Sequence, residues 1–508
     1  LNALASGSVV AYHVVNVALH LTVALLLWAL TRRTVPRLGG DEALAWGGRG
    51  VALAVALVWA VHPLVSEAVN YLTQRTELLM AACYLGTLLA AARALDDEAG
   101  AARWQVTAVA TCAIGMLAKE SMATAPVAVV LYDLTFGGLS WRDAWTTRGR
   151  FYGALAATWL VLAAILMGSP RALSAGFSTG VSPWTYLLNQ GAIVTRYLRL
   201  AVWPMGLVVD YGHPLPVSLA QAWPGVAFVA TLAAATVVAL WRWPLVGACA
   251  AWVFLTLAPT SSVMPIATEV GAERRMYLPL MGLVALFMAG SAWWASHVVD
   301  RARWGMLRTS GRVAVAVLVV ALGTTTMARN REYQSPYELA RVTVERWPSA
   351  AAHETWGEQL ARAGRHAEAV AALRMAVDGG VTRARYLLGG ELLEVGRLGE
   401  AATELRAWLS GGAAVPGLVP GAQRMLGSAL AQQQQWPEAI AAYRASLAAA
   451  PTDADVRMDL AHALVAAERY AEAVPEFERA LTARPRDAAA WTSLGVAQAR
   501  GGNREAAD

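Results

Sequence analysis

Long apolar stretches with few charges fill the chain up to about Arg329, and they constrain its fold more than any other feature. A helix needs roughly 20 mainly apolar residues to cross a bilayer. Only 15% of all residues are charged, against about 25% in soluble domains, so a water-facing surface could not be covered. The sequence therefore predicts an all-α fold whose first part, residues 1–330, is a polytopic transmembrane helical bundle.

Ten segments have the length and composition of a span, several of them short. They are 9–30, 47–64, 77–94, 104–118, 121–135, 151–169, 224–241, 243–259, 277–296 and 313–328. An eleventh apolar segment, 187–203, is interrupted by Arg196 and Arg199 on one helical face, which favours a helix lying along the interface. We take ten spans, with 187–203 outside the count.

Arginine clusters predict the orientation of these spans. They follow the first, fifth and ninth segments: Arg32, Arg33, Arg37 and Arg49; Arg142, Arg148 and Arg150; Arg301, Arg303, Arg308 and Arg312. All three share one side if 187–203 does not cross, and arginine-rich loops are cytoplasmic. The loops 62–76, 170–223 and 260–276, with everything after residue 330, are then non-cytoplasmic: in the periplasm of a bacterium or the ER lumen of a eukaryote.

Beyond residue 330 charged residues become frequent, and a small residue recurs every 32 to 38 positions, at Ala369, Ala401, Ala439, Ala473 and Ala507. The two clearest repeats read WPEAIAAYRASLAAAP and YAEAVPEFERALTARP, with alanine, an aromatic residue, a small residue and proline at matching offsets. This pattern is typical of TPR helix pairs. We expect a linker at 331–349 and a TPR α-solenoid of about five repeats at 350–508. Its groove would bind protein segments; a spacer or an oligomerisation surface is the alternative.

The ends of the sequence suggest a fragment of a longer protein. It begins at Leu1 rather than Met, and it ends at Asp508 within a repeat. We expect one further span and an outer loop before Leu1.

Several other classes of site find no support. Cys83, Cys112 and Cys249 lie inside apolar segments without CxxC or Cys/His spacing, as small buried hydrophobic residues do. We predict no metal site and no firm cofactor. The arginines sit in short loops without interleaved aromatic residues, so we predict no nucleic-acid partner.

Ionisable residues in or beside spans are functional candidates, because a charge there is costly. His13, Asn16 and His20 share one face of the first span, and for Asn16 and His20 we favour hydrogen bonds to neighbouring helices. His62 ends the second span. Glu67 and Arg75 follow it in the outer loop, where Arg75 could orient a phosphate; a Glu67–Arg75 salt bridge is the alternative.

A second group of candidates includes the only lysine among 41 basic residues, Lys119, beside Glu120. Lysine is a compact point charge and arginine a planar fork, so a tight phosphate site can require lysine; pairing with Glu120 is the alternative. A third group follows in the outer loop before the ninth span: Glu269, Glu273, Arg274, Arg275 and Tyr277. Arginine binds phosphate bidentately, so this pair suits an anionic lipid headgroup; solvated loop charges are the alternative.

With these residues in view, the chain resembles the transmembrane and TPR-repeat-containing protein O-mannosyltransferases of the GT-C glycosyltransferase superfamily. The matching stretches are YHVVNVALH (12–20), HPLVSEAVNYLTQR (62–75), GMLAKESMATAPVAVVLYDLTF (115–136), LVVDYGHPLP (207–216) and PTSSVMPIATEVGAERRMYLPL (259–280). The resemblance implies a GT-C-like bundle that transfers mannose, or a similar sugar, from a polyprenyl-phosphate carrier to Ser or Thr of proteins bound by the TPRs.

The resemblance also implies roles for single residues. Lys119, Arg274, Arg275 and Arg75 would hold the donor phosphate, and the pocket would be shaped by His62, Glu67, Glu120, Glu273, Tyr277 and His13. The family's catalytic carboxylate lies in the first outer loop, so the general base is expected upstream of Leu1. Two other readings stay open: a non-catalytic membrane-anchored TPR scaffold, and a GT-C enzyme acting on a lipid or cell-wall glycan.

Overall fold

The computed structural model describes residues 9–38, 48–97, 99–168, 176, 181–262, 264–298, 304–411 and 415–502. The chain divides into two compact units, Leu1–Arg346 and Trp347–Asp508. The described residues form helices and no strand, which confirms the predicted all-α fold. Each unit is considered by itself below.

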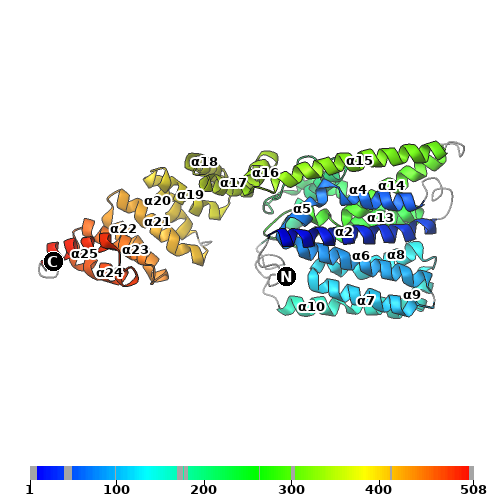
Figure 1. Cartoon of the computed structure of the whole chain (residues 1–508), viewed down its shortest axis with the longest axis horizontal. Helices are drawn as coiled ribbons and strands as arrows, with labels where there is room; N and C mark the ends of the chain where they lie inside the picture. Colours follow the sequence, from blue (N-terminus) through cyan, green and yellow to red (C-terminus); the bar gives the residue numbers. More distant parts are fainter. Residues whose placement is uncertain are drawn as a thin grey trace. The chain divides into compact units, whose positions relative to one another are not determined.

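Unit 1 is a bundle whose longer helices run side by side (Figure 1). Its α-helices are α2 (Val9–Thr34), α4 (Gly48–Ala60), α5 (Ser66–Asn70), α6 (Arg75–Asp96), α7 (Ala101–Ala118), α8 (Ala125–Phe136), α9 (Trp141–Ala157), α10 (Trp159–Gly168), α11 (Pro183–Val202), α12 (Leu219–Arg242), α13 (Pro244–Leu257), α14 (Pro279–Val298), α15 (Trp304–Glu332) and α16 (Pro336–Arg346). Short 3-10 helices are η1 (Val35–Leu38), η2 (Pro63–Val65), η3 (Leu72–Gln74), η4 (Glu120–Thr124) and η5 (Glu273–Met276).

Several of these helices are long and apolar enough to cross a membrane. Within the described residues five meet this criterion, and a sixth is added if α4 and the segment Pro63–Asn70, bent by 57°, count as one broken span. The apolar helix α13 and the apolar part of α14, Pro279–Ser291, are shorter. Unit 1 is thus a multi-pass membrane domain, while the full set of ten spans stays a prediction.

The outer helices α12 and α15 expose many apolar side chains. On α15, Val313, Val317 and Val320 are each more than half exposed, and only 11% of the apolar window of α12 is buried. Apolar patches of this extent are unfavourable in water but match lipid chains.

Helix α11, which contains the ambiguous segment 187–203, differs from its neighbours. It buries one face, including Tyr186 and Tyr197, and it does not reach the hydropathy of the candidate spans. It packs closely on α12, because a Cβ on Gly191 would lie 2.7 Å from the backbone nitrogen of Val226. Glycine permits this backbone contact.

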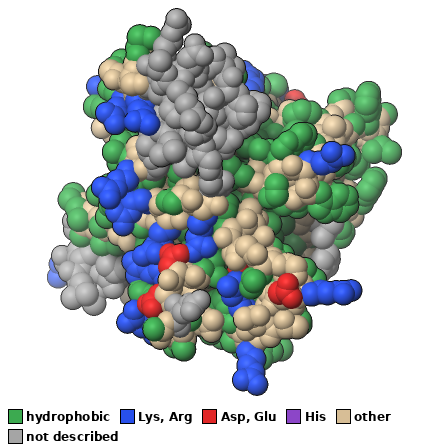
Figure 2. Space-filling model, turned by 90° about the vertical axis from the view of Figure 1, so that its right-hand side faces the viewer, with side chains coloured by type: hydrophobic (Ala, Val, Ile, Leu, Met, Phe, Trp, Pro, Cys, Tyr) green, Lys and Arg blue, Asp and Glu red, His purple; other side chains and the backbone are tan. Residues whose placement is uncertain are grey.

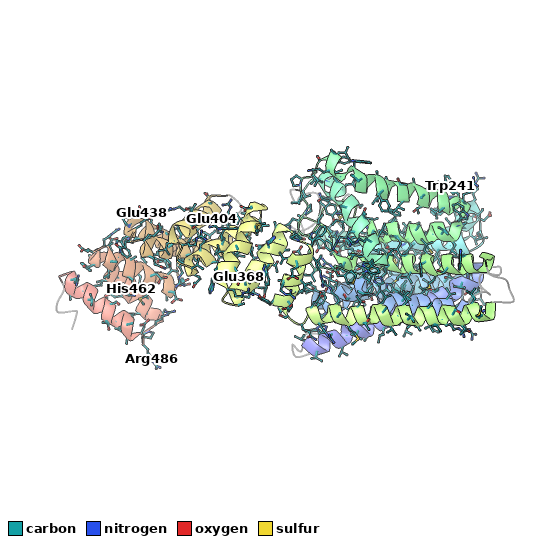
Figure 3. All side chains as sticks on the ribbon, turned by 90° about the horizontal axis from the view of Figure 1, so that it is seen from above. Trp241, Glu368, Glu404, Glu438, His462 and Arg486 are labelled. Atoms are coloured by element: carbon teal, nitrogen blue, oxygen red, sulfur yellow. The ribbon has the colours of Figure 1, made fainter. Side chains whose placement is uncertain are left out.

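The arginine clusters gather at one end of unit 1. Arg32 and Arg33 end α2, Arg142 begins α9, and Arg308 lies in the first turns of α15, all at the right-hand end of the bundle in Figure 1. Figure 2 faces this end and shows basic side chains, which are arginines here, among apolar ones. Trp241, at the end of α12, is 80% exposed (Figure 3), as tryptophans at a membrane interface are. Arg301 and Arg303 lie outside the described residues.

Unit 2 is an array of antiparallel helix pairs. Its helices are α17 (Ala350–Arg362), α18 (His366–Asp378), α19 (Thr382–Glu394), α20 (Leu398–Ser410), η7 (Pro416–Leu418), α21 (Val419–Gln432), α22 (Trp436–Ala449), α23 (Ala454–Ala466), α24 (Tyr470–Ala483) and α25 (Ala488–Arg500). The predicted small residues Ala369, Ala401, Ala439 and Ala473 are fully buried. Ala507 lies outside the described part of the chain.

The segment expected as a linker, 331–349, is mostly helical. It holds the end of α15 and all of α16, and unit 1 extends to Arg346. Charged residues made this segment look like a linker, but those charges pair within it: Arg341 binds Glu338 and Glu345 on one face of α16.

Glycines set the spacing within the helix pairs of unit 2. A Cβ on Gly357 would lie 2.6 Å from Leu373, one on Gly389 2.5 Å from Leu405, and one on Gly427 2.6 Å from Tyr443. Each glycine is in the first helix of a pair and its neighbour is in the second. A side chain at any of these positions would push the two helices apart.

Gly427→Val should therefore destabilise unit 2 by about 1–3 kcal/mol, the usual cost of overpacking. Gly399→Val is the matched control, since a Cβ at this exposed helical position would meet only Gln433 at 4.0 Å. Thermal unfolding of the purified protein, followed by circular dichroism, measures both. Equal effects of the two substitutions would contradict this role of Gly427.

Candidate functional site

Three stretches far apart in the sequence meet at the end of unit 1 opposite the arginine clusters. They are 62–75, 207–216 and 259–280, the outer-loop segments on which the resemblance rests. Helix α5 and η2 contact η5, and the loop after α11 joins them through hydrogen bonds. The site is therefore built from short helices and loops that begin where spans end.

The first stretch begins at a break after α4. Pro63 has no backbone N–H and cannot continue the helix. His62 caps the 3-10 turn that follows: its Nδ1 accepts a hydrogen bond from the Leu64 backbone at 3.1 Å. The proton is then on Nε2, which donates to the Ala201 carbonyl at 3.2 Å. With both ring nitrogens used and 3% of its surface exposed, His62 fixes the bend and ties it to α11.

Glu67 and Arg274 form the central ion pair of the site. Glu67, which is 2% exposed, accepts hydrogen bonds from the Arg274 guanidinium at 2.5 Å and from the Arg274 backbone nitrogen at 2.8 Å. The second guanidinium nitrogen of Arg274 pairs with Glu269. The alternative pairing of Glu67 with Arg75 is not the one found: Arg75 stacks over the ring of Tyr12 instead, 4.4 Å from its centroid.

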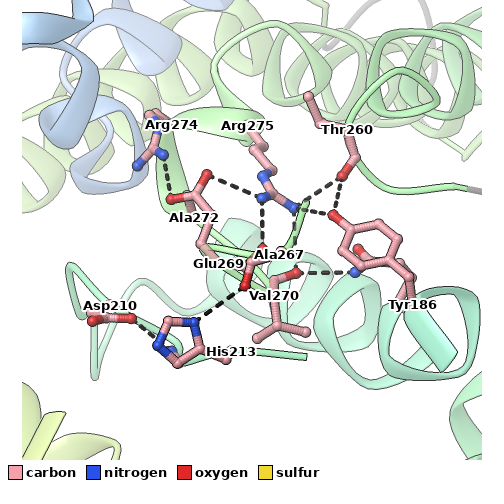
Figure 4. Close-up of polar contacts among 12 residues, drawn as sticks. Tyr186, Asp210, His213, Thr260, Ala267, Glu269, Val270, Ala272, Arg274 and Arg275 are labelled. Carbon is pink, nitrogen blue, oxygen red and sulfur yellow. Dashed lines mark hydrogen bonds and ion pairs between the residues drawn. The ribbon is translucent and has the colours of Figure 1, made fainter. Parts of the chain in front are cut away.

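Arg275 points the other way, into the protein (Figure 4). It donates to the Tyr186 hydroxyl and the Thr260 carbonyl, both at 3.0 Å, and to the Glu269 carboxylate at 3.1 Å. Its side chain is 2% exposed. A phosphate could bind here only if Arg275 gave up these bonds, so its position fits a role in holding the loop 260–270.

Backbone contacts fix the same loop from two more sides. The Tyr197 hydroxyl accepts from the Ala272 nitrogen at 2.7 Å, and it is also 2.9 Å from the Ala272 carbonyl. The Val270 nitrogen donates to the Gly212 carbonyl at 2.8 Å, and His213 hydrogen-bonds the Ala267 carbonyl (Figure 4). The loop is thus held by α11 and by residues 207–216.

Glu273 is fully buried beside this loop. It accepts hydrogen bonds from the Val208 nitrogen at 2.5 Å and from the Tyr211 hydroxyl at 3.2 Å, and Arg329 lies 3.7 Å from its other oxygen. Arg329 also binds Glu332 at 2.5 Å, and Glu332 binds Arg346 at 2.7 Å. A row of polar contacts therefore runs from η5 through the end of α15 to the last residue of unit 1, and it includes the ion pairs of Glu332 with Arg329 and Arg346.

The pKa values of Glu269 and Glu273 shift in opposite directions. Burial alone would raise the pKa of Glu269, but the charges of Arg275 and Arg274 lower it below its ordinary value. For Glu273, burial outweighs the charge of Arg329 and raises the pKa to about 8. At neutral pH Glu269 is thus ionised and Glu273 is mostly protonated.

Lys119 lies at the same end of the bundle, between α7 and η4. Its ammonium pairs with Glu77 in the first turn of α6, and its side chain is 18% exposed. Glu120 begins η4 directly after it. The pairing of Lys119 with Glu77 was not predicted; the only signal for it was an acidic residue at the start of an apolar segment.

Polar residues of α2 hydrogen-bond Tyr277, which directly follows η5, and nearby backbone carbonyls. His20 hydrogen-bonds the Tyr277 hydroxyl at 2.8 Å and the Ala60 carbonyl at 2.9 Å, and Asn16 donates to the Val69 carbonyl at 2.9 Å. These bonds confirm the predicted interhelical role of Asn16 and His20. His13 is half-buried one turn before Asn16.

The structure therefore brings together several predicted site residues: Glu67, Glu273, Arg274, Arg275 and Tyr277. Arg75 lies in the first turn of α6, where Lys119 is bound through Glu77. Tyr186, Tyr197 and Tyr211 could not be selected from the sequence, because tyrosines in or beside apolar segments look like core residues. Among the described residues, no group of three or more His, Cys, Asp or Glu could hold a metal ion.

Known proteins are similar to this chain in both the membrane unit and the repeats. Tetratricopeptide-repeat family profiles match residues 386–454 and 430–494. Protein O-mannosyl-transferase Tmtc3 of Drosophila melanogaster is 25% identical over 434 residues, which cover 72% of this chain and 46% of that protein. The chain is a relative of the TMTC-type protein O-mannosyltransferases. The resemblance inferred from the sequence is thereby confirmed.

Further TMTC proteins match shorter regions. TMTC1 of Mus musculus is 32% identical over 24% of this chain and 13% of that protein, and Tmtc2 of Drosophila melanogaster is 29% identical over 40% and 21%. The chain thus spans less than half the length of these relatives.

Solved structures also align with part of the chain. MamA of Desulfovibrio magneticus is 22% identical over 31% of this chain and 88% of that chain (TM-score 0.29). YrrB, a TPR protein, is 20% identical over 33% and 86% (TM-score 0.30). The TPR assignment rests on the family profiles and the helix pairs, not on these scores.

The buried pair of Glu67 and Arg274 should be strongly coupled. Arg274→Gln alone leaves Glu67 buried without an ionic partner and should cost about 3–5 kcal/mol, as breaking buried ion pairs does; Glu67→Gln should cost less, because Arg274 keeps its pairing with Glu269. In a double-mutant cycle with Arg274→Gln, the two changes should deviate from additivity by at least about 1 kcal/mol. The exposed pair of Arg341 and Glu338 is the control, with a coupling below about 1 kcal/mol. Unfolding in detergent measures both cycles; additivity at Glu67 and Arg274 would refute the coupling.

Glu273 should make stability depend on pH. Its pKa is raised in the folded protein from an ordinary 4.5 to about 8, so its contribution is fully present below pH 4.5 and is lost as the pH rises through 8. The melting temperature should therefore fall between about pH 6 and 9, and Glu273→Gln should flatten this part of the curve. The exposed Glu438 (Figure 3), changed to Gln, is the control. Parallel curves for both variants and the parent would exclude Glu273 as the cause.

Proposed function

We propose that this protein is a membrane glycosyltransferase that moves mannose, or a similar sugar, from a polyprenyl-phosphate carrier to Ser or Thr of protein acceptors. One observation carries the proposal: the separate stretches that resemble the O-mannosyltransferases converge on one polar cluster at one end of an apolar bundle. The relatives named above are protein O-mannosyltransferases, which supports the same reaction.

The reaction needs positive charge near the leaving phosphate, because negative charge develops there in the transition state. Lys119 suits this role best. It has three N–H donors, one of which pairs with Glu77, and its side chain is partly exposed at the end of α7. Arg75 is also partly exposed, in the first turn of α6, the helix that carries Glu77. Arg274 is positioned by Glu67 and Glu269, and Arg275 in turn binds Glu269.

The acceptor and its side of the membrane complete the proposal. The ion-pair cluster lies at the end of unit 1 away from the exposed arginines, which by the positive-inside rule is the non-cytoplasmic end. TPR grooves hold extended protein segments, so unit 2 would bind the acceptor and raise its local concentration at the site.

The sharpest test changes Lys119. In the full-length protein, Lys119→Gln should lower sugar transfer from polyprenyl-phosphate mannose to protein acceptors by about 100-fold or more, the usual effect of losing one transition-state donor. Lys119→Arg should restore it only in part, because the planar fork does not replace a point charge. Transfer in isolated membranes is measured with radiolabelled donor.

Arg150→Gln is the matched control, since this exposed residue lies in α9, away from the site. It should leave transfer unchanged. Full activity of Lys119→Gln would remove Lys119 from the donor site. If the unaltered protein transfers no sugar to any protein, the enzyme proposal itself fails and the scaffold reading takes its place.

A further inference from the structure

A cavity at the arginine-rich half of unit 1 has no part in the proposed reaction. Its volume is about 180 Å³, and it lies between α2, α4, α6, α8, α13 and α14. Its walls are almost entirely apolar and include Leu30, Val55, Leu88 and Trp252. An apolar cavity of about 150 Å³ can take up benzene, so this one has room for a segment of hydrocarbon chain.

Two arginines lie next to the polar rim of the cavity. Thr34 lines it and hydrogen-bonds Tyr132 at 3.0 Å, another lining residue. Arg33, directly before Thr34, and Arg37, three residues after it, both pair with a single carboxylate, Asp96 at the end of α6. Arg37 also donates to the carbonyl of Phe136, which lines the cavity, at 3.0 Å.

The charge of this rim favours an anion. Two guanidinium groups face one carboxylate, which leaves a net positive charge, and all three side chains are partly exposed, at 33%, 19% and 38%. Guanidinium groups bind phosphate through paired hydrogen bonds. Basic pockets between membrane helices bind the headgroups of anionic lipids.

We propose that the cavity and the Arg33–Arg37 pair form one binding site for an anionic phospholipid, with an acyl chain in the cavity and the phosphate at the arginines. The sugar-carrier lipid does not fit this position. Its phosphate is proposed at Lys119, beside the first turn of α6, whereas Asp96 is the last residue of that helix. A helix of 22 residues is about 33 Å long, the thickness of the hydrocarbon core, so the two headgroups occupy opposite leaflets.

Native mass spectrometry of the delipidated protein tests this. Phosphatidylglycerol should bind about tenfold more tightly than phosphatidylcholine with the same chains, as expected for charge-assisted hydrogen bonds. Arg33→Gln with Arg37→Gln should remove the preference, and Asp96→Asn should strengthen it. The control, Arg142→Gln with Arg150→Gln, removes two exposed arginines from α9, which does not line the cavity; it should keep the preference.

A second pair of variants tests the cavity. Ala285→Phe on α14 should fill it and weaken binding of both lipids, whereas Gly290→Phe on the same helix, where a Cβ meets open space, should not. A photoactivatable acyl chain on phosphatidylglycerol, used with the unaltered protein, should label α8 or α13.

Three results would overturn the proposal. They are equal binding of the two phospholipids by the unaltered protein, labelling confined to the outer faces of α12 and α15, and one-for-one displacement of phosphatidylglycerol by polyprenyl phosphate. The last would assign the cavity to the carrier lipid.

Discussion

The ion pair of Glu67 with Arg274 is the interaction on which the rest of the site depends. It joins residues 207 positions apart in the sequence, and both lie where little water reaches. A buried charge without a partner costs several kcal/mol, so Glu67 is stable there only while Arg274 is in place, whereas Arg274 also pairs with Glu269. The pair therefore holds the loop before α14 against the bend after α4, and this contact brings the remaining polar residues within reach of one another.

The two ends of unit 1 use charge in opposite ways. At one end the arginines are paired with carboxylates inside the protein, as Arg274 is with Glu67 and Arg329 is with Glu332. At the other end several are exposed, such as Arg142 and Arg150. Exposed arginines suit an anionic membrane surface, whereas enclosed pairs suit a site that must keep a fixed geometry. The apolar bundle between them keeps the two environments apart.

The sequence predicts the helical bundle and the repeats because both depend on patterns that are local. Apolar length defines the spans, and the recurring alanines, such as Ala439, mark helix contacts that each repeat makes by itself. It also selects Glu67, Lys119 and Arg274 as unusual charges near a membrane. It cannot select their partners, because a partner such as Glu77 depends on which helices become neighbours. The helix at 336–346 was missed for a related reason: its charges stabilise it through pairs along one face, which resemble a solvated linker.

The adjacent residues Arg274 and Arg275 show how one motif serves two purposes. On the 3-10 turn of η5 they point in different directions, so Arg275 is enclosed by Tyr186 and Thr260 while Arg274 reaches Glu67. Because Glu273 is mostly protonated at neutral pH, the four arginines of the network face only three carboxylates. The arginines are Arg274, Arg275, Arg329 and Arg346; the carboxylates are Glu67, Glu269 and Glu332. A network with excess positive charge, fixed by its own internal bonds, is consistent with the phosphate site proposed above.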